Sequence, residues 1–167
     1  MKRFMTAVAA LAFISVAGAM PAAAQNQTVI SQFGRDNGVA AMQNGTRNRA
    51  VIGQDGRGHY SRAWQQGSRN FVRMEQAGTR NRAETEQNGH DNLAVTGQEG
   101  RRLSAGIFQS GRGNVSGVAQ IGNRSIATTE QIGVNNTTGV IQVGDNQDAA
   151  VTQRGDNNIT VVVQGGP

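Results

Sequence analysis

Residues 48–58, NRAVIGQDGRG, contain the pattern that decides the fold of this chain. The same skeleton returns 22 residues later as NFVRMEQAGTR, from Asn70, and again as NLAVTGQEGRR, from Asn92. Asparagine, a small residue, glutamine and glycine keep their places, while the residues between them change. A fixed period of this length indicates a repeat architecture in which each unit stacks on its neighbours.

Glutamine and glycine recur every 11 residues without a slip. The thirteen glutamines are Gln32, Gln43, Gln54, Gln65, Gln76, Gln87, Gln98, Gln109, Gln120, Gln131, Gln142, Gln153 and Gln164. The glycines that follow them by two residues are Gly34, Gly45, Gly56, Gly67, Gly78, Gly89, Gly100, Gly111, Gly122, Gly133, Gly144, Gly155 and Gly166. No insertion interrupts this register.

Asparagine adds a second period of 22 residues. It precedes alternate glutamines by six residues, at Asn26, Asn48, Asn70, Asn92, Asn114, Asn136 and Asn158. The same offset in the intervening half-repeats holds Asn37, His59, Asn81, Leu103, Ser125 and Gln147. The repeating unit therefore consists of two similar but unequal halves.

The spacing favours strands over helices. An 11-residue period can produce a right-handed coiled coil, but a regularly placed glycine is costly in a helix and no apolar stripe runs through. Alternate positions such as Ala50, Ile52 and Gln54 are constrained, while Arg49 and its outward equivalents vary, as side chains on two faces of a strand do. The sequence predicts an all-β, two-sheet β-solenoid of strand-turn-strand repeats, with six to seven rungs and the glycines at the turns. Its handedness stays open.

Stacking explains why asparagine and glutamine recur. Identical side chains lie about 4.8 Å apart in a cross-β stack and can form hydrogen-bonded ladders. A buried amide is costly unless it is paired, so every rung needs the same residue at the same place. The glutamines, asparagines and glycines are the candidate assembly residues.

The first 24 residues read as a secretory signal peptide. MKR is a basic start, an apolar stretch follows, and Ala22-Ala23-Ala24 supplies a small-residue cleavage site between Ala24 and Gln25. The alternative is an uncleaved membrane anchor. Residues 25–167 then form one repeat domain. Removing Lys2 and Arg3 leaves 14 basic and 11 acidic residues, a net charge of about +3, with no cysteine for disulfides.

The repeat resembles the curlin repeat of curli fibre subunits. NRAETEQNGHDNLAVTGQEG, residues 81–100, and SIATTEQIGVNN, residues 125–136, carry the pattern Asn-x-Ala-x-x-x-Gln-x-Gly-x-x-Asn, with Ser125 in the family's serine position. The resemblance implies an extracellular functional amyloid that self-polymerises on the bacterial surface for biofilm matrix, adhesion and colonisation. It implies three partners: further copies of the chain, the other curli subunit and the outer-membrane curli export machinery. It does not decide between the major subunit and the nucleator.

Two features depart from the family pattern. No glycine-rich segment separates Gln25 from the first repeat, which leaves export recognition open. His59, Leu103 and Gln147 replace the usual serine or asparagine, so we expect imperfect ladders in those rungs.

The sequence contains no convincing catalytic constellation. His59 and His90 stand 31 residues apart without a cysteine or a carboxylate cluster, whereas structural zinc needs four clustered ligands. We therefore expect neither an enzyme nor a cofactor or metal site. The alternative function is a monomeric secreted β-solenoid adhesin or binding module.

Arginines near the turns form the remaining pattern. We expect them to line one edge of the stack, either to oppose lateral sticking or to contact extracellular DNA or acidic polysaccharide. They are Arg47, Arg69, Arg80, Arg101, Arg102 and Arg124.

The last half-repeat, residues 158–164, has a complete inward face and an uncharged outward face. Strand edges of this kind are templates for pairing with another chain. We expect head-to-tail growth, with this strand stacking on the first strands, residues 26–32 and 37–43, of the next copy.

Overall fold

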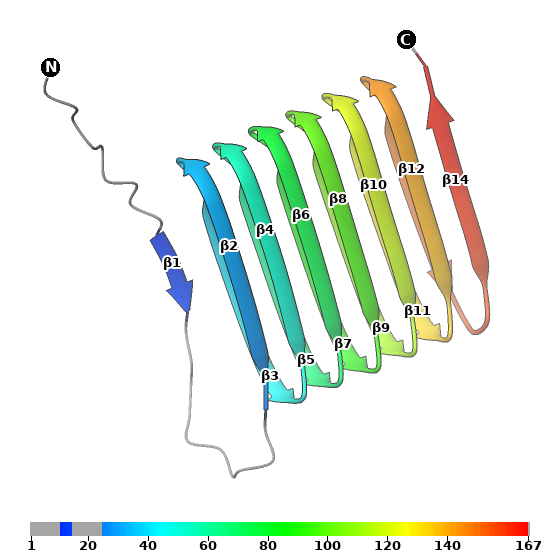
Figure 1. Cartoon of the computed structure of the whole chain (residues 1–167). Coiled ribbons are helices and arrows are strands. Elements are labelled where there is room, and N and C mark those ends of the chain that lie inside the picture. Colours follow the sequence, from blue (N-terminus) through cyan, green and yellow to red (C-terminus); the bar gives the residue numbers. More distant parts are fainter. Residues whose placement is uncertain (1–10, 15–24, 167) are drawn as a thin grey trace, which may run out of the picture.

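The computed structural model describes residues 11–14 and 25–166, and the described chain is all-β. Two seven-stranded parallel sheets face each other in a flattened solenoid (Figure 1). One contains the even-numbered strands, in the order β14-β12-β10-β8-β6-β4-β2, and is called the even sheet below. The other, the odd sheet, has the order β1-β3-β5-β7-β9-β11-β13. The predicted two-sheet β-solenoid is confirmed.

The strands have nearly uniform lengths. They are β1 (Leu11–Ile14), β2 (Gln27–Arg35), β3 (Gly38–Thr46), β4 (Arg49–Arg57), β5 (Tyr60–Ser68), β6 (Phe71–Thr79), β7 (Arg82–His90), β8 (Leu93–Arg101), β9 (Ser104–Arg112), β10 (Val115–Asn123), β11 (Ile126–Val134), β12 (Thr137–Asp145), β13 (Asp148–Arg154) and β14 (Ile159–Gly165). β1 pairs in parallel with the outer edge of β3. The cleavage residue Ala24 lies outside the described residues, and Gln25 is exposed coil.

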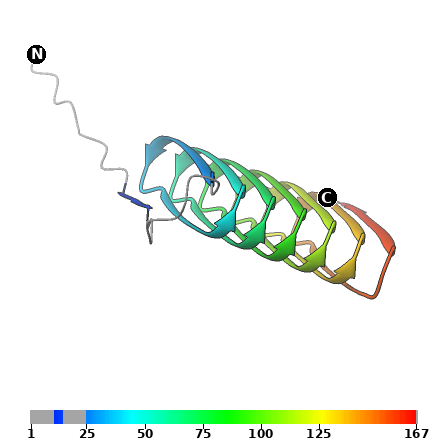
Figure 2. The same cartoon turned by 90° about the horizontal axis from the view of Figure 1, so that it is seen from below.

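The register follows the 22-residue period. Gln54 of β4 pairs with Gln76 of β6, which pairs with Gln98 of β8, and the remaining pairs of repeat strands keep the same offset. A slip by one residue would turn every inward side chain outward, so the constrained alternate positions hold this register. The result is a regular tube with its first and last strands at opposite ends (Figure 2).

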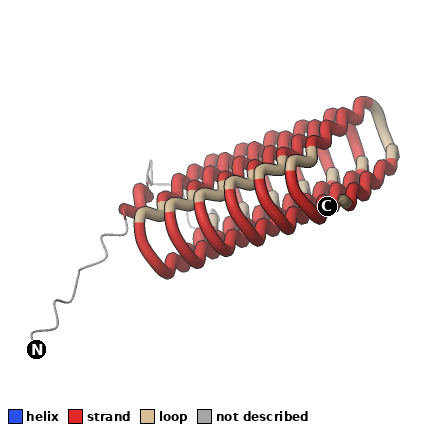
Figure 3. Tube along the Cα trace, turned by 90° about the horizontal axis from the view of Figure 1, so that it is seen from above, coloured by secondary structure: helices blue, strands red, loops and turns tan. Residues whose placement is uncertain are grey.

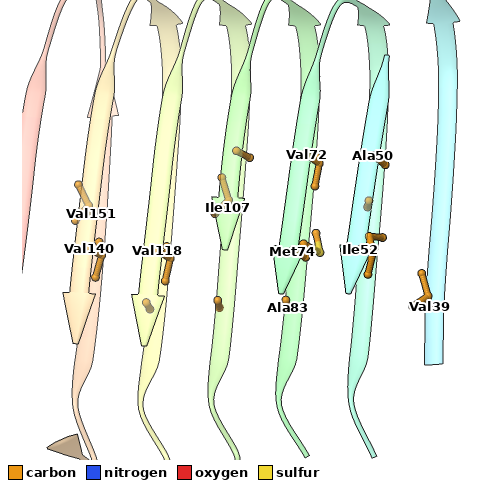
Figure 4. Packing of buried hydrophobic residues seen from close by; sticks show 14 of the residues in the cluster. Val39, Ala50, Ile52, Val72, Met74, Ala83, Ile107, Val118, Val140 and Val151 are labelled. Carbon is orange, nitrogen blue, oxygen red and sulfur yellow. The ribbon is translucent and has the colours of Figure 1, made fainter. Parts of the chain in front are cut away.

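The hydrophobic core is a thin layer between the two sheets. Small residues such as Ala50, Val72 and Ala94 stack in one column, and larger ones such as Ile52 and Met74 stack beside it, all at most 1% exposed. Figure 4 shows Ala50, Ile52, Val72 and Met74 of this layer between the sheets, with Ile107 and Val118 further along. Because few large apolar residues are present, cohesion depends on the polar side chains that share the layer.

The corners differ from the predicted turns. The glycines that stack on a glycine of the next rung lie inside strands, as Gly56 does in β4 and Gly100 in β8, and not at the turns. Most strands therefore have nine residues. The chain turns at the residue that precedes each position of the asparagine column, such as Asn48 or Asn81. Ten of these turn residues are not glycine and have φ between 56° and 60°. Five are arginine: Arg47, Arg69, Arg80, Arg102 and Arg124. Figure 3 shows the corners as rows along the edges of the tube.

Candidate functional site

The glutamines form two continuous side-chain ladders, one in each sheet. In eleven bonds of 2.7–2.9 Å, the Nε2 of one glutamine donates to the Oε1 of the glutamine 22 residues later. All eleven point toward the C-terminal end of the solenoid. The donors and acceptors run from Gln32 to Gln164 in the even sheet and from Gln43 to Gln153 in the odd sheet.

Each ladder is also tied to the opposite sheet. Gln87 Nε2, for example, donates to the Phe71 carbonyl at 3.1 Å as well as to Gln109 Oε1 at 2.9 Å, and it accepts from Gln65 at 2.9 Å. Gln87 is fully buried. Burying an amide is costly unless its hydrogen bonds are made, and here the neighbouring rungs and the facing sheet supply them.

Asparagine holds the corners. The Oδ1 of Asn48 accepts the backbone N–H of Asn70 at 3.0 Å, and the Nδ2 of Asn48 donates to the Gly67 carbonyl at 2.9 Å. Asn70 and Asn92 repeat the first contact, at 3.2 Å. The asparagine of one rung therefore satisfies backbone groups of the next. Asn26 and Asn158, in the end rungs, are exposed.

The substituted positions of this column behave differently from one another. His59 continues the ladder, because its Nδ1 accepts the Asn81 N–H at 3.3 Å while its Nε2 contacts the Asp55 carbonyl at 3.1 Å. The interruption expected there is absent. The backbone N–H of Leu103 donates to Asn81 Oδ1 at 3.1 Å, but the Leu103 side chain has no acceptor for the backbone N–H of the following rung. Gln147 leaves its Oε1 buried without a partner.

The ladder glycines lie too close together to carry side chains. A Cβ built on eleven of them, from Gly34 to Gly144, would stand 1.9–2.2 Å from the carbonyl oxygen of the glycine in the next rung. Their φ angles lie between 101° and 135°, which L side chains rarely adopt. The 11-residue period predicted where these glycines recur, but we expected them at the turns and not inside the strands. The sequence alone did not indicate that each glycine lies so close to the carbonyl oxygen of the glycine in the next rung.

The corner arginines do not form one line, contrary to the sequence-based expectation. Arg47 and Arg69 lie at corners that lead into even strands, and Arg80, Arg102 and Arg124 lie at corners that lead out of them, beside Arg101. The second edge is called the basic edge below. Its charged corner residues are Arg35, Arg57, Arg80, Arg101, Arg102, Arg124, Asp36 and Asp145.

Charge pairing distinguishes the two edges. On the edge opposite the basic edge, Arg69 lies 2.5 Å and Arg112 3.6 Å from Asp91. The hydrogen bond from Arg69 lowers the pKa of the Asp91 carboxyl, and the same contact raises the pKa of Arg69. On the basic edge six arginines face two aspartates, of which Asp36 pairs with Arg57 at 3.5 Å. Positive charge is therefore concentrated on one edge.

An open groove of about 570 Å³ crosses β2 to β10, and its lining includes Phe33, Glu75 and Ile121. Within the described ranges, 11–14 and 25–166, histidine and acidic residues form no group that could hold a metal ion. The same ranges include no helix long and apolar enough to cross a membrane.

A family model described as the curlin associated repeat matches residues 34–67, 45–78 and 122–155. Each match begins at a ladder glycine, so the three matches share the phase of the glutamine and glycine columns. No curated protein matches the chain. The repeat matches, together with the two-sheet β-solenoid, place this chain in the curlin associated repeat family, the family of curli subunits.

Proposed function

We propose that the chain is a structural subunit of an extracellular amyloid fibre of the curli type, which polymerises on the bacterial surface and contributes to biofilm matrix, adhesion and colonisation. The observation that carries this proposal is the directional glutamine ladder, in which the end residues Gln32, Gln43 and Gln164 are only half-buried. A ladder of this kind gains its missing partners when another copy stacks on it.

The direction of the ladder supports head-to-tail contact. Gln164 accepts from Gln142 and, at its Nε2, donates to the Asp148 carbonyl. At the other end Gln32 donates to Gln54. A copy added in the same direction brings its Oε1 acceptors to the Nε2 donors at the C-terminal end, whereas a copy added in reverse brings donors against donors.

The proposal extends to secretion and partners. Residues 1–24 act as a signal peptide that is cut between Ala24 and Gln25, and the chain leaves through the outer-membrane curli export machinery. Removing this segment also removes β1 from the outer edge of β3, which frees that edge for another copy or for the other curli subunit. N-terminal sequencing of the secreted protein tests the cleavage, and a start at Met1 would refute it.

Val162→Asp tests fibre growth at the last strand. Val162 is half-buried in the single chain, but a copy stacked on β14 would enclose it. An unpaired carboxylate is strongly disfavoured there, so we expect seeded elongation to slow by at least about tenfold, which corresponds to about 1.4 kcal/mol. Thioflavin fluorescence with wild-type seeds measures the rate.

Val163→Asp is the matched control, because Val163 lies one residue further on the same strand, points outward and is 69% exposed. We expect this variant to elongate at the wild-type rate. Equal rates for both variants would show that growth does not use β14. A wild-type chain that stays monomeric after dilution from denaturant would favour the adhesin alternative.

We further propose that the basic edge contacts extracellular DNA or an acidic polysaccharide, through phosphate or carboxylate groups. Replacing Arg80, Arg102 and Arg124 with glutamine removes three of its charges, and the matched control replaces Arg47, Arg69 and Arg112 on the other edge. Because each released counterion adds to affinity, we expect the first variant to bind duplex DNA at least about tenfold more weakly, with a shallower salt dependence. Cosedimentation of DNA with preformed fibres measures this, and equal losses in both variants would contradict an edge-specific contact.

A further inference from the structure

The two sheets contain unequal numbers of repeat strands. The thirteen strands from β2 to β14 alternate between the sheets, so seven of them lie in the even sheet and six in the odd sheet. Each turn of the solenoid contains one strand of each sheet, and the thirteen strands therefore make six and a half turns. The seventh strand of the odd sheet is β1, which precedes the repeats and pairs with β3.

The extra half turn leaves a gap if the next copy stacks without rotation. In that arrangement β2 of the next copy pairs with β14, but β3 of the next copy lies two strand spacings from β13, about 9.6 Å instead of about 4.8 Å. The facing edges of β13 and β3 then keep their backbone N–H and C=O groups unpaired, which is unfavourable inside a stack. The glutamine ladder that ends at Gln153 does not continue across such a gap.

A half turn of the next copy about the fibre axis closes the gap. It brings β2 of that copy beside β13 and β3 beside β14, each at one strand spacing. Consecutive strands run in opposite directions across the tube (Figure 1), so the rotation that exchanges the two sheets also reverses the strand directions. Both new strand pairs are therefore parallel, as the pairs within the solenoid are.

The two halves of the repeat are alike where successive rungs touch, so either sheet can continue the other. Both halves carry glutamine and glycine at the same offsets. After the half turn, Gln164 Nε2 meets the Oε1 of Gln43 in the next copy, and Gln153 Nε2 meets the Oε1 of Gln32. Both ladders then cross the junction, and each passes from one sheet of the first copy to the other sheet of the second.

The outer edge of β3 already accepts a parallel strand within the single chain. β1 pairs with it in a register that runs from Leu11 beside Gly38 to Ile14 beside Ala41. After a half turn, β14 of the preceding copy takes this same place, whereas no repeat strand reaches it in an unrotated stack. Cleavage after Ala24, proposed above, removes β1 and frees the place.

We propose that each copy in the fibre is rotated by half a turn about the fibre axis relative to the copy before it, so that β14 pairs with β3 and β13 with β2 of the next copy. The inference rests on the head-to-tail assembly proposed above and specifies its contact. Two copies then form one axial repeat of thirteen rungs, about 62 Å long, and the basic edge lies on alternate sides of the fibre.

Pairs of introduced cysteines test the rotation, and the chain has no cysteine of its own. The register that places Gln164 beside Gln43 also places Val163 beside Met42, whereas an unrotated stack places Val163 beside Ser31. All three of these side chains point outward and are exposed. Neighbouring strands lie about 4.8 Å apart, which is within the range of Cα separations that a disulfide spans.

The two double variants are Val163→Cys with Met42→Cys and Val163→Cys with Ser31→Cys. Fibres of the secreted chains are grown with reductant, oxidised, and then separated on a denaturing gel without reductant. We expect the first variant to give covalent multimers in at least about tenfold higher yield than the second, because in a rotated stack Val163 and Ser31 lie on opposite sheets, beyond the reach of a disulfide. Val163→Cys alone is the control for contacts between fibres, and it should remain monomeric on the gel.

The cross-linking pattern separates this inference from the proposed function. Multimers formed mainly by the pair with Ser31→Cys would overturn the half turn and leave fibre assembly intact. Fibres in which the two pairs cross-link equally, or in which neither does, would also overturn it. A wild-type chain that forms no fibres would refute the proposed function itself.

Discussion

Gly100→Ala is expected to abolish folding of the central rungs. A Cβ at this position would stand 1.9 Å from the carbonyl oxygen of Gly122, and the φ of +135° is itself unfavourable for alanine. The clashing atom belongs to the backbone of the next rung, so it cannot move without breaking the strand pairing on both sides. We expect a loss of at least about 4 kcal/mol, in the range reserved for severe core defects. Circular dichroism after dilution from denaturant should show little β-structure.

Gly97→Ala is the control for this substitution. Gly97 lies on the same strand, β8, but has no positive φ, and a Cβ there meets nothing within 4 Å. We expect its fibres to resist guanidinium as the wild type does, within about 0.5 kcal/mol. Equal behaviour of the two alanine variants would show that the glycine column is not constrained by the next rung.

Gln87→Glu is expected to block assembly at neutral pH and to allow it in acid. The introduced carboxylate keeps the shape of glutamine but loses the two N–H donors that reach Gln109 and the Phe71 carbonyl. A buried unpaired charge costs several kcal/mol. The neutral acid form regains one donor, so the stability lost at neutral pH returns as the pH falls and the carboxyl is protonated. Thioflavin lag times at pH 7 and pH 4 measure this.

Two further variants serve as comparisons for Gln87→Glu. Gln87→Ala leaves neighbouring amides underpaired without adding a charge, so we expect a smaller loss of about 1–3 kcal/mol that does not change with pH. Arg73→Ala removes only an exposed ion pair with Glu75, which is worth less than about 1 kcal/mol. Lag times that are equal for Gln87→Glu at both pH values would contradict a buried position for this side chain.

The sequence was sufficient to predict the architecture, because the period itself encodes the register. Glutamine at a spacing of 11 residues specifies which residues stack, and the alternation of fixed and variable positions specifies which face is inward. Gln54, Gln76 and Gln98 are paired in the structure as the period requires. A repeat protein is unusual in this respect, since long-range contacts can be read from one short unit.

The corners could not be predicted in the same way. Polar residues after Gly56 or Gly100 suggested that the glycines themselves were the turns, but these glycines pair within strands and the chain bends two or three residues later. The arginines at the corners did not indicate a turn, because residues other than glycine, asparagine and aspartate seldom adopt a left-handed conformation. The pairing along the stack compensates for that strain.

The side-chain ladder of His59 was also beyond sequence reasoning. Only its ring geometry shows that Nδ1 can replace the asparagine Oδ1 as an acceptor for Asn81. The distribution of arginines over two edges follows from the fold: corner residues 11 apart lie on opposite edges, and corner residues 22 apart share one edge. Arg69 and Arg80 are close in sequence but lie on opposite edges of the tube.

The uniform direction of the glutamine bonds gives the solenoid an electrical axis. Backbone dipoles in sheets largely cancel, but the side-chain amides of the two ladders all orient their N–H groups toward the C-terminal end. Aligned amide dipoles add, as they do in a helix, although here the positive end lies at the C-terminal strands. In the proposed fibre such units would place opposite partial charges at the two ends, so we expect unlike ends to attract one another and like ends to repel.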